Sequence, residues 1–91
     1  MQDNVDHKKT QEELEIELIE TEKMIKIGSR YSHFKRPDRT YKVVGLGIQE
    51  RTEKICVIYQ AEYGRKLIFV RDLESWLEQP QVGVDRFKLV E

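Results

Sequence analysis

The stretch of sequence that decides the fold runs from residue 55 to residue 76 and reads ICVIYQAEYGRKLIFVRDLESW. Two segments rich in β-branched and aromatic residues flank the letters YGRK at residues 63–66, a combination typical of two strands joined by a tight turn. A short helical turn is predicted to follow the second strand. The stretch therefore predicts a β-hairpin at the centre of the hydrophobic core.

Size and composition limit the classes of protein to consider. The 91 residues suit one small domain, and 38% hydrophobic with 36% charged residues describes a soluble protein with a modest core. The longest apolar run, residues 55–59, is far shorter than the ~18 residues of a membrane helix. The first residues lack the apolar segment of an export signal. We expect no membrane contact.

Cysteine and histidine content bears on location and cofactors. Cys56 is the only cysteine, so no intramolecular disulfide can form, which favours a reducing cytoplasm. One cysteine and two widely separated histidines do not make a ligand cluster, so we expect no metal and no cofactor.

Charge divides the chain into two parts. Residues 1–28 carry four basic and eight acidic side chains, a net charge of −4. Residues 29–91 carry twelve basic and nine acidic side chains, a net charge of +3, and the two sums return the overall −1. We therefore expect an acidic appended segment over 1–28 and a mildly basic domain over 29–91.

The appended segment has the signals of a helix. Thr10 and Glu13 have the spacing of a capping box, in which each side chain bonds the other residue's backbone N–H. Acidic residues crowd the first turns and lysines occupy the last, which suits the helix dipole. Gly28 provides a left-handed stop. These signals predict a helix over residues 11–27.

The apolar residues of this helix fall on more than one face. Leu14, Leu18 and Ile25 share one face, whereas Ile16 and Ile27 point nearly opposite. In one interpretation a single stripe docks on the domain and the rest is partly exposed. In a second, the other stripe contacts another chain. A strand is a third interpretation, because apolar residues also alternate locally, but the density of glutamate argues against it.

From residue 29 onward the apolar period changes to two, with frequent turn signals. Strands are predicted at residues 30–35, 41–49, 55–62, 66–70 and 86–90. Pro37 and Asp38 predict a type I turn between the first two strands, and Gly45 and Gly47 predict a bulge or sharp bend in the second. The predicted fold class is mainly β: a small five-stranded SH3-like barrel with an N-terminal α-helix and a short helical turn before the last strand. We expect the N-terminal helix to cover one open end of the barrel.

The short helical turn is predicted from its own residues. Asp72 or Ser75 has the chemistry of its N-cap, and Leu73, Trp76 and Leu77 share one helical face. Trp76 is therefore expected to fill the core rather than to present a platform for a ligand.

Six short segments, in order along residues 29–90, carry a resemblance to a known family. They are YSHFK at 31–35, YKV at 41–43, VIY at 57–59, YG at 63–64, FVR at 69–71 and RF at 86–87. This part of the chain resembles the bacterial family known as domain of unknown function 1653. The resemblance implies a small SH3-type barrel and no established activity. The chain departs from the family at residues 36–38, at residues 49–52 and at Asp72, and the N-terminal helix lies outside the resemblance.

The sequence contains no recognisable catalytic motif. The serines lack the context of an activated nucleophile, and Cys56 lies inside an apolar strand, where it is expected to be a small core residue. The letters GLG at 45–47 are not a phosphate-binding loop, because neither a third glycine nor a helix start follows. We expect a binding protein and not an enzyme.

The most suggestive surface feature is the stretch from residue 30 to residue 42, which carries five basic side chains and one acidic side chain, with aromatic residues interleaved. Basic side chains neutralise phosphates and aromatic rings stack on bases. The candidate ligand-binding residues are Arg30, His33, Phe34, Lys35, Arg36, Lys42 and Arg71. The competing interpretation is that Tyr31 and Tyr41 face inward and belong to the core, because alternate strand residues point to opposite faces.

For several residues the sequence leaves two interpretations open. Arg71 forms either an ion pair with Asp72 at the barrel rim, which we favour, or a binding contact beside Trp76. The side chains of Tyr59 and Tyr63 lie either in the core or at the surface. The predicted function is a small binding module for single-stranded nucleic acid or a nucleotide. The alternative is a protein–protein or dimerisation module that uses the N-terminal helix or an aromatic groove.

Overall fold

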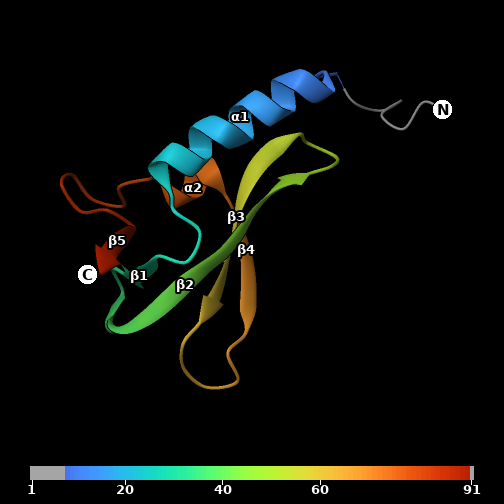
Figure 1. The fold of residues 1–91 in the computed structure, drawn as a ribbon. Coiled ribbons are helices and arrows are strands. Elements are labelled where there is room, and N and C mark those ends of the chain that lie inside the picture. Colours follow the sequence, from blue (N-terminus) through green and yellow to red (C-terminus); the bar gives the residue numbers. More distant parts are fainter. Residues whose placement is uncertain (1–7, 91) are drawn as a thin grey trace.

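Five strands form a single antiparallel sheet in the computed structural model, which describes residues 8–90. The elements in chain order are α1 (Gln11–Met24), β1 (Arg30–His33), β2 (Arg36–Gln49), β3 (Lys54–Ala61), β4 (Ile68–Asp72), α2 (Leu73–Trp76) and β5 (Phe87–Val90) (Figure 1). The mainly β class, the N-terminal helix and the short helix before the last strand are as predicted.

The sheet has the strand order β4-β3-β2-β1-β5, so β4 and β5 are its two edges. Within β2, Val43 pairs with Tyr59 and Gly45 pairs with Ile58, which leaves Val44 as an extra residue. This is the bulge that the glycines predicted, and a bulge bends and twists its strand. The sheet is nevertheless not closed into a barrel, because β4 and β5 do not pair with each other. The SH3-like assignment stays a prediction.

The turn between β1 and β2 differs from the prediction. It lies at residues 34–35, and Pro37 is inside β2 instead of at the centre of a type I turn. Phe34 N–H donates to the carbonyl of Arg86 at 2.9 Å, and Lys35 N–H donates to His33 Nδ1 at 3.1 Å. These bonds end β1 early. The register then leaves residues 37–39 without a partner on β1, where the missing N–H of proline costs nothing.

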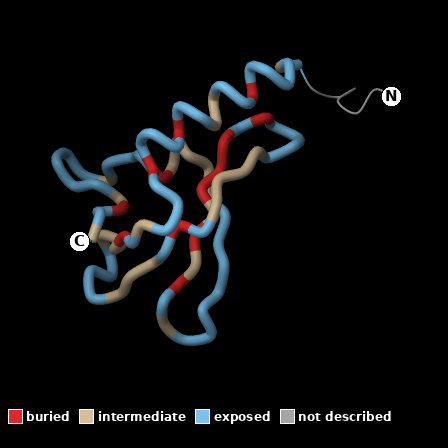
Figure 2. The backbone as a smooth tube through the Cα atoms, in the orientation of Figure 1, coloured by how far each residue is buried: buried red, intermediate tan, exposed pale blue. Residues whose placement is uncertain are grey.

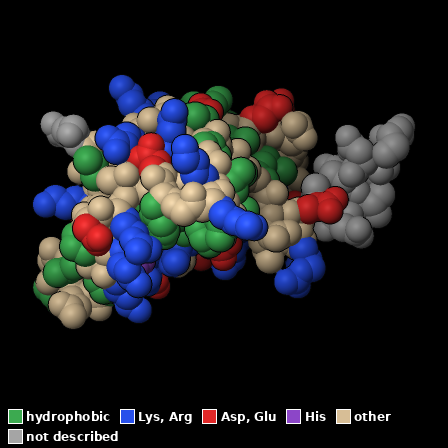
Figure 3. Space-filling model, turned by 90° about the horizontal axis from the view of Figure 1, so that it is seen from below, with side chains coloured by type: hydrophobic (Ala, Val, Ile, Leu, Met, Phe, Trp, Pro, Cys, Tyr) green, Lys and Arg blue, Asp and Glu red, His purple; other side chains and the backbone are tan. Residues whose placement is uncertain are grey.

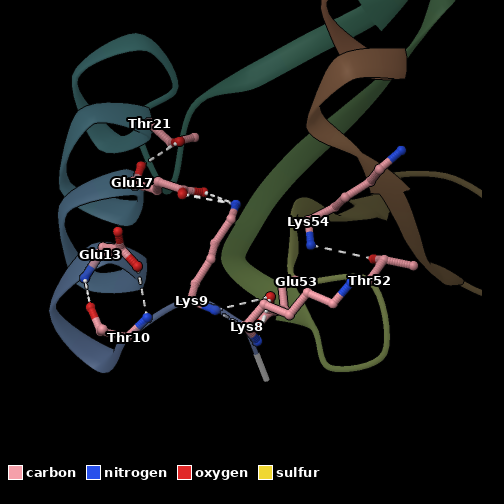
Figure 4. Close-up of polar contacts among 9 residues, drawn as sticks. All are labelled: Lys8, Lys9, Thr10, Glu13, Glu17, Thr21, Thr52, Glu53 and Lys54. Atoms are coloured by element: carbon pink, nitrogen blue, oxygen red, sulfur yellow. Dashed lines mark hydrogen bonds and ion pairs between the residues drawn. The ribbon is translucent and has the colours of Figure 1, made fainter. Parts of the chain in front are cut away.

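The N-terminal helix begins as predicted and ends early. Thr10 Oγ1 accepts the Glu13 N–H at 3.0 Å, and Glu13 Oε1 accepts the Thr10 N–H at 2.8 Å, which completes the capping box (Figure 4). The helix stops at Met24 because Ile25 turns to an extended conformation and enters the core. Gly28, at φ +96°, therefore lies in the connection to β1 instead of at the helix terminus.

Helix α1 docks along one stripe. Leu14 and Ile25 are buried, whereas Ile16 and Ile27 are exposed, as the first interpretation expects. The strand interpretation was wrong, and contact of the exposed residues with another chain stays a prediction. The backbone N–H groups of the two lysines before the helix donate to the Glu53 carboxylate at 3.2–3.3 Å, which ties the helix start to the β2–β3 turn (Figure 4). Figure 1 shows α1 running from this turn toward α2, so the helix covers one end of the sheet. Neither helix of the described chain is long and apolar enough to cross a membrane.

The core lies between the sheet, α2 and the end of α1, where the buried segments meet (Figure 2). Its buried members are Ile25, Tyr31, Val43, Val57, Tyr59, Trp76 and Phe87. Trp76 is 3% exposed and its ring stacks on Phe87, with centroids 3.7 Å apart, as the core prediction requires. Leu77 is 51% exposed, contrary to the predicted shared face, because α2 is a single turn that ends at Trp76.

Two further predictions in this region were only partly right. Asp72 is the N-cap residue of α2, as predicted, but its side chain makes no capping bond, because Oδ1 accepts from Cys56 Sγ at 3.5 Å. Ser75 lies inside the helix, and its Oγ accepts from Arg71 at 2.9 Å. The second strand of the central hairpin, β4, starts at Ile68 because Lys66 has φ +56° in the preceding turn. Of the hairpin, only β3 is largely buried.

Candidate binding site

The predicted binding residues divide between two faces of the sheet. Arg30 pairs with Lys42 and Tyr31 pairs with Tyr41 across β1 and β2. Because Tyr31 is buried, its neighbour Arg30 and the paired Lys42 point away from the core. Arg30 Nε donates to Glu62 Oε1 at 2.7 Å, and this bond is the main reason why the pKa of Glu62 is below its usual value. The prediction that Arg30 and Lys42 share a site with the other residues was therefore wrong.

The other basic candidates gather on one hollow. We call it the aromatic hollow; its volume is about 300 Å³. Its lining residues are His33, Lys35, Arg36, Tyr41, Tyr59, Phe69, Arg71 and Phe87. They come from the end of β1, the turn after it, the start of β2, and strands β3, β4 and β5. No aspartate or glutamate is among them. On the face seen in Figure 3, blue side chains gather beside the histidine.

Aromatic rings form the floor of the aromatic hollow. Tyr59 lies edge-on to Tyr41 at 5.6 Å and near-parallel to Phe69 at 5.7 Å between ring centroids. Tyr59 is buried, which settles the open question of its place, whereas Phe69 is 38% exposed. Phe69 is not among the binding residues predicted from the sequence. Its signal was the two-residue spacing from Arg71, which puts both side chains on the same face of β4.

Arg71 is held in the aromatic hollow by neutral partners. Its Nε donates to the Tyr59 hydroxyl at 3.4 Å and its Nη1 donates to Ser75 Oγ at 2.9 Å, while the guanidinium lies 5.4 Å from the centre of the Phe87 ring. It forms no ion pair with Asp72, because consecutive strand residues point to opposite faces. The favoured prediction was wrong, and Arg71 holds a fixed positive charge beside the rings.

His33 forms a wall of the aromatic hollow. Its ring lies 4.8 Å from the Phe34 ring and 5.0 Å, edge-on, from Phe87. Burial, followed by the positive charges of neighbours including Arg71, lowers the pKa of His33. Because Nδ1 accepts the Lys35 N–H, the neutral imidazole carries its proton on Nε2. That leaves a donor for an oxygen of a ligand.

A pair of tyrosines forms the rim next to β2. The hydroxyls of Tyr41 and Tyr63 lie 2.7 Å apart, and the guanidinium of Arg39 is 4.5 Å from the centre of the Tyr63 ring. Burial and this hydrogen bond raise the pKa of Tyr41 to about 12, and the same bond lowers the pKa of Tyr63. The contact ties the β3–β4 turn to β2, and Tyr63 is half-buried.

Phe34 lies in a second hollow next to the first. This hollow has a volume of about 360 Å³. It is lined by Ser32, His33, Phe34, Pro37, Gly83, Val84, Asp85 and Lys88. Because His33 lines both hollows, Phe34 lies beside the aromatic hollow instead of within it.

The described residues show no arrangement for metal binding: within 8–90, no group of three or more His, Cys, Asp or Glu side chains is placed to hold an ion. Cys56 is buried, as predicted, and burial raises the pKa of its thiol. A buried thiol of raised pKa is a poor nucleophile.

Comparison with known proteins gives one match. Residues 29–89 match the family described as "Protein of unknown function (DUF1653)". The chain belongs to this family. The match confirms the resemblance, starts just after α1, and includes the strands and turn that build the aromatic hollow. No curated protein and no solved structure was found to match the chain.

Proposed function

We propose that this family member is a binding module, not an enzyme, for single-stranded nucleic acid or nucleotides, and that the aromatic hollow is the site. The observation that carries the proposal is the lining of this hollow: four basic or titratable cationic residues meet four aromatic rings without an acidic side chain. Cationic side chains neutralise phosphates, and rings stack on bases of any sequence.

The residues that line the aromatic hollow would make different contacts with a ligand, according to their exposure. Phe69 offers the accessible ring on which a base stacks. Lys35 and Arg36 are exposed at the rim, where a phosphate stays partly hydrated. Arg71 is positioned in advance by Tyr59 and Ser75, so that little side-chain entropy is lost when it meets a ligand.

The placement of the acidic helix supports the proposal. Helix α1 contributes no residue to the aromatic hollow. Figure 1 shows α1 at the end of the sheet away from the turn between β1 and β2. Repulsion between its carboxylates and a phosphate is therefore reduced by distance and by salt screening.

Location and fold type belong to the same proposal. A buried cysteine without a disulfide partner suits a reducing compartment, and we propose a cytoplasmic location on this ground. The bulged, bent antiparallel sheet with one helical turn before the last strand supports an SH3-like arrangement with open edges.

The test is a titration of a fluorescent single-stranded oligonucleotide followed by anisotropy at several salt concentrations. We expect weak binding whose log–log salt dependence has a slope of roughly −0.7 per phosphate contacted. The double variant Lys35→Glu, Arg36→Glu should abolish binding. The matched control is Lys42→Glu, which reverses a charge on the opposite face and should leave most of the affinity. Binding lost equally in the control, or absent at low salt, removes the proposal.

A second candidate is contact with another protein through α1. Ile16, Ile19 and Met24 are exposed on this helix, and exposed apolar side chains on a helix are typical of partner surfaces. Deletion of residues 1–28 tests this candidate, because a dimer formed through α1 would become a monomer.

A further inference from the structure

The two edges of the sheet differ in how well they are protected. Strand β4 pairs only with β3, in a regular register without a bulge, so its other side is free. The four consecutive residues from 67 to 70 are all apolar and exposed by 59%, 60%, 38% and 65%. Natural sheets protect their edges with lysine, proline or bulges. The edge strand β5 carries Lys88, whereas β4 has no such residue between Leu67 and Val70.

The free edge continues into an apolar strip on the outer face of the sheet. Ile58 of β3 pairs with Val70 on one side and with Gly45 on the other. The bulged residue Val44 is exposed beside this strip. The solvent-facing side of an antiparallel sheet is ordinarily polar. An apolar strip that reaches an unprotected edge is typical of an interface.

We propose that two copies of this chain associate through their β4 strands, which pair antiparallel about a two-fold axis at Phe69. The sequence of residues 67–71, LIFVR, sets apolar residues opposite one another in this register. Ile68 of each copy faces the partner's Val70. Leu67 faces the aliphatic stem of the partner's Arg71. An interface with two-fold symmetry must match itself in this way.

Neighbouring registers match less well. A two-fold axis at Ile68 would set Val70 against the partner's Lys66, which lies in the turn before the strand at φ +56°. An axis at Val70 would set Ile68 against the partner's Asp72. Among the three, only the register centred on Phe69 gives both Ile68 and Val70 an apolar partner.

The association has a consequence for the aromatic hollow. Phe69 and Arg71 face the core side of β4, opposite Tyr59 and Val57. A two-fold axis perpendicular to the sheet keeps this side continuous, so the two hollows would lie next to each other across the axis. The dimer is nevertheless independent of what the hollow binds.

The first test is the molar mass in solution, measured by light scattering after gel filtration over a range of concentrations. We expect a mass near twice 10.9 kDa at high concentration. Val70→Lys, at an exposed position, should yield a folded monomer, with circular dichroism as the check of folding. The matched control is Leu89→Lys on β5, also exposed, which should leave the dimer intact. A monomeric wild type, or a dimer that survives Val70→Lys, overturns the proposal.

The second test examines the register. In the proposed dimer Phe69→Cys places two cysteines directly opposite each other, with Cα atoms about 4.5–5.5 Å apart, which suits a disulfide. Leu67→Cys places them four residues out of register, about 13 Å apart. Under mild oxidation we expect a covalent dimer of the first variant and not of the second, while the buried Cys56 gives a low background in the wild type. Equal cross-linking of both variants, or of neither, overturns the register.

Discussion

At the scale of single residues, one ring pair holds the core together. Trp76 stacks on Phe87 and lies edge-on to Tyr31 at 5.2 Å and to Tyr59 at 5.0 Å. It thereby joins α2 to strands β1, β3 and β5. A small domain buries little surface, so a large share of its stability rests on such a residue.

Trp76→Ala should lower the free energy of unfolding by about 3–5 kcal/mol, because it removes a buried aromatic side chain and leaves a cavity. Urea denaturation followed by circular dichroism measures the change. Leu77→Ala is the matched control in the same turn, and its effect should stay within about 0.5 kcal/mol because Leu77 is exposed. Equal effects of the two variants would contradict the burial of Trp76.

His33 gives a prediction about pH. Its pKa in the folded protein is lowered from 6.5, with the charge of Arg71 as a cause after burial. An NMR titration should therefore find a pKa below 6.5, and Arg71→Gln should raise it. Because the unfolded chain takes up the proton first, the contribution of His33 to stability is complete above pH 6.5 and is lost as the pH falls from there through the folded pKa. A pKa that ignores the Arg71 substitution would contradict the charge arrangement of the hollow.

At the scale of elements, a local signal sets the start of helix α1 and a tertiary contact sets its end. The capping box sets the start of the helix through bonds between residues three apart. The end is set by Ile25, which leaves the helical conformation to reach the core. Lys9 Nζ adds an ion pair with Glu17 at 2.9 Å, which raises the pKa of Lys9.

Thr10→Ala should reduce stability by about 1 kcal/mol, because the Glu13 N–H loses its acceptor at the helix start. Thr10→Ser keeps the hydroxyl and should retain most of the stability. Thermal unfolding measures both. If alanine and serine behaved alike, the hydroxyl would not be acting as the cap.

At the scale of the whole molecule, the segment outside the family match is part of the folded domain. Ile25 belongs to the core cluster, and Leu14 is buried farther along the same helix. The family match starts at residue 29, so this chain completes its core with a segment beyond the match.

Deleting residues 1–28 should lower the melting temperature, because the deletion exposes the apolar surface beneath Leu14 and Ile25. The molar mass of the shortened chain separates the two candidate interfaces. A dimer through β4 keeps twice the monomer mass, whereas a dimer through α1 becomes a monomer. An unchanged melting temperature would mean that the helix does not stabilise the sheet.

The sequence by itself determined the features that depend on near neighbours. The capping box, the bulge next to Gly45, the turn at residues 63–66 and the burial of Trp76 follow from residue types and short-range spacing, and the structure has all of them. The number of strands and the mainly β class follow from the apolar period.

Tertiary structure decided which residues share a site. The basic stretch after residue 29 looks continuous in sequence, but its side chains divide between two faces once Tyr31 is buried and paired with Tyr41. The bond from Phe34 to Arg86 then shifts the turn and the start of β2. Strand order alone made β4 an edge and brought Phe69 and Arg71 beside Lys35. Register and strand order depend on partners far apart in the chain, which no local pattern encodes.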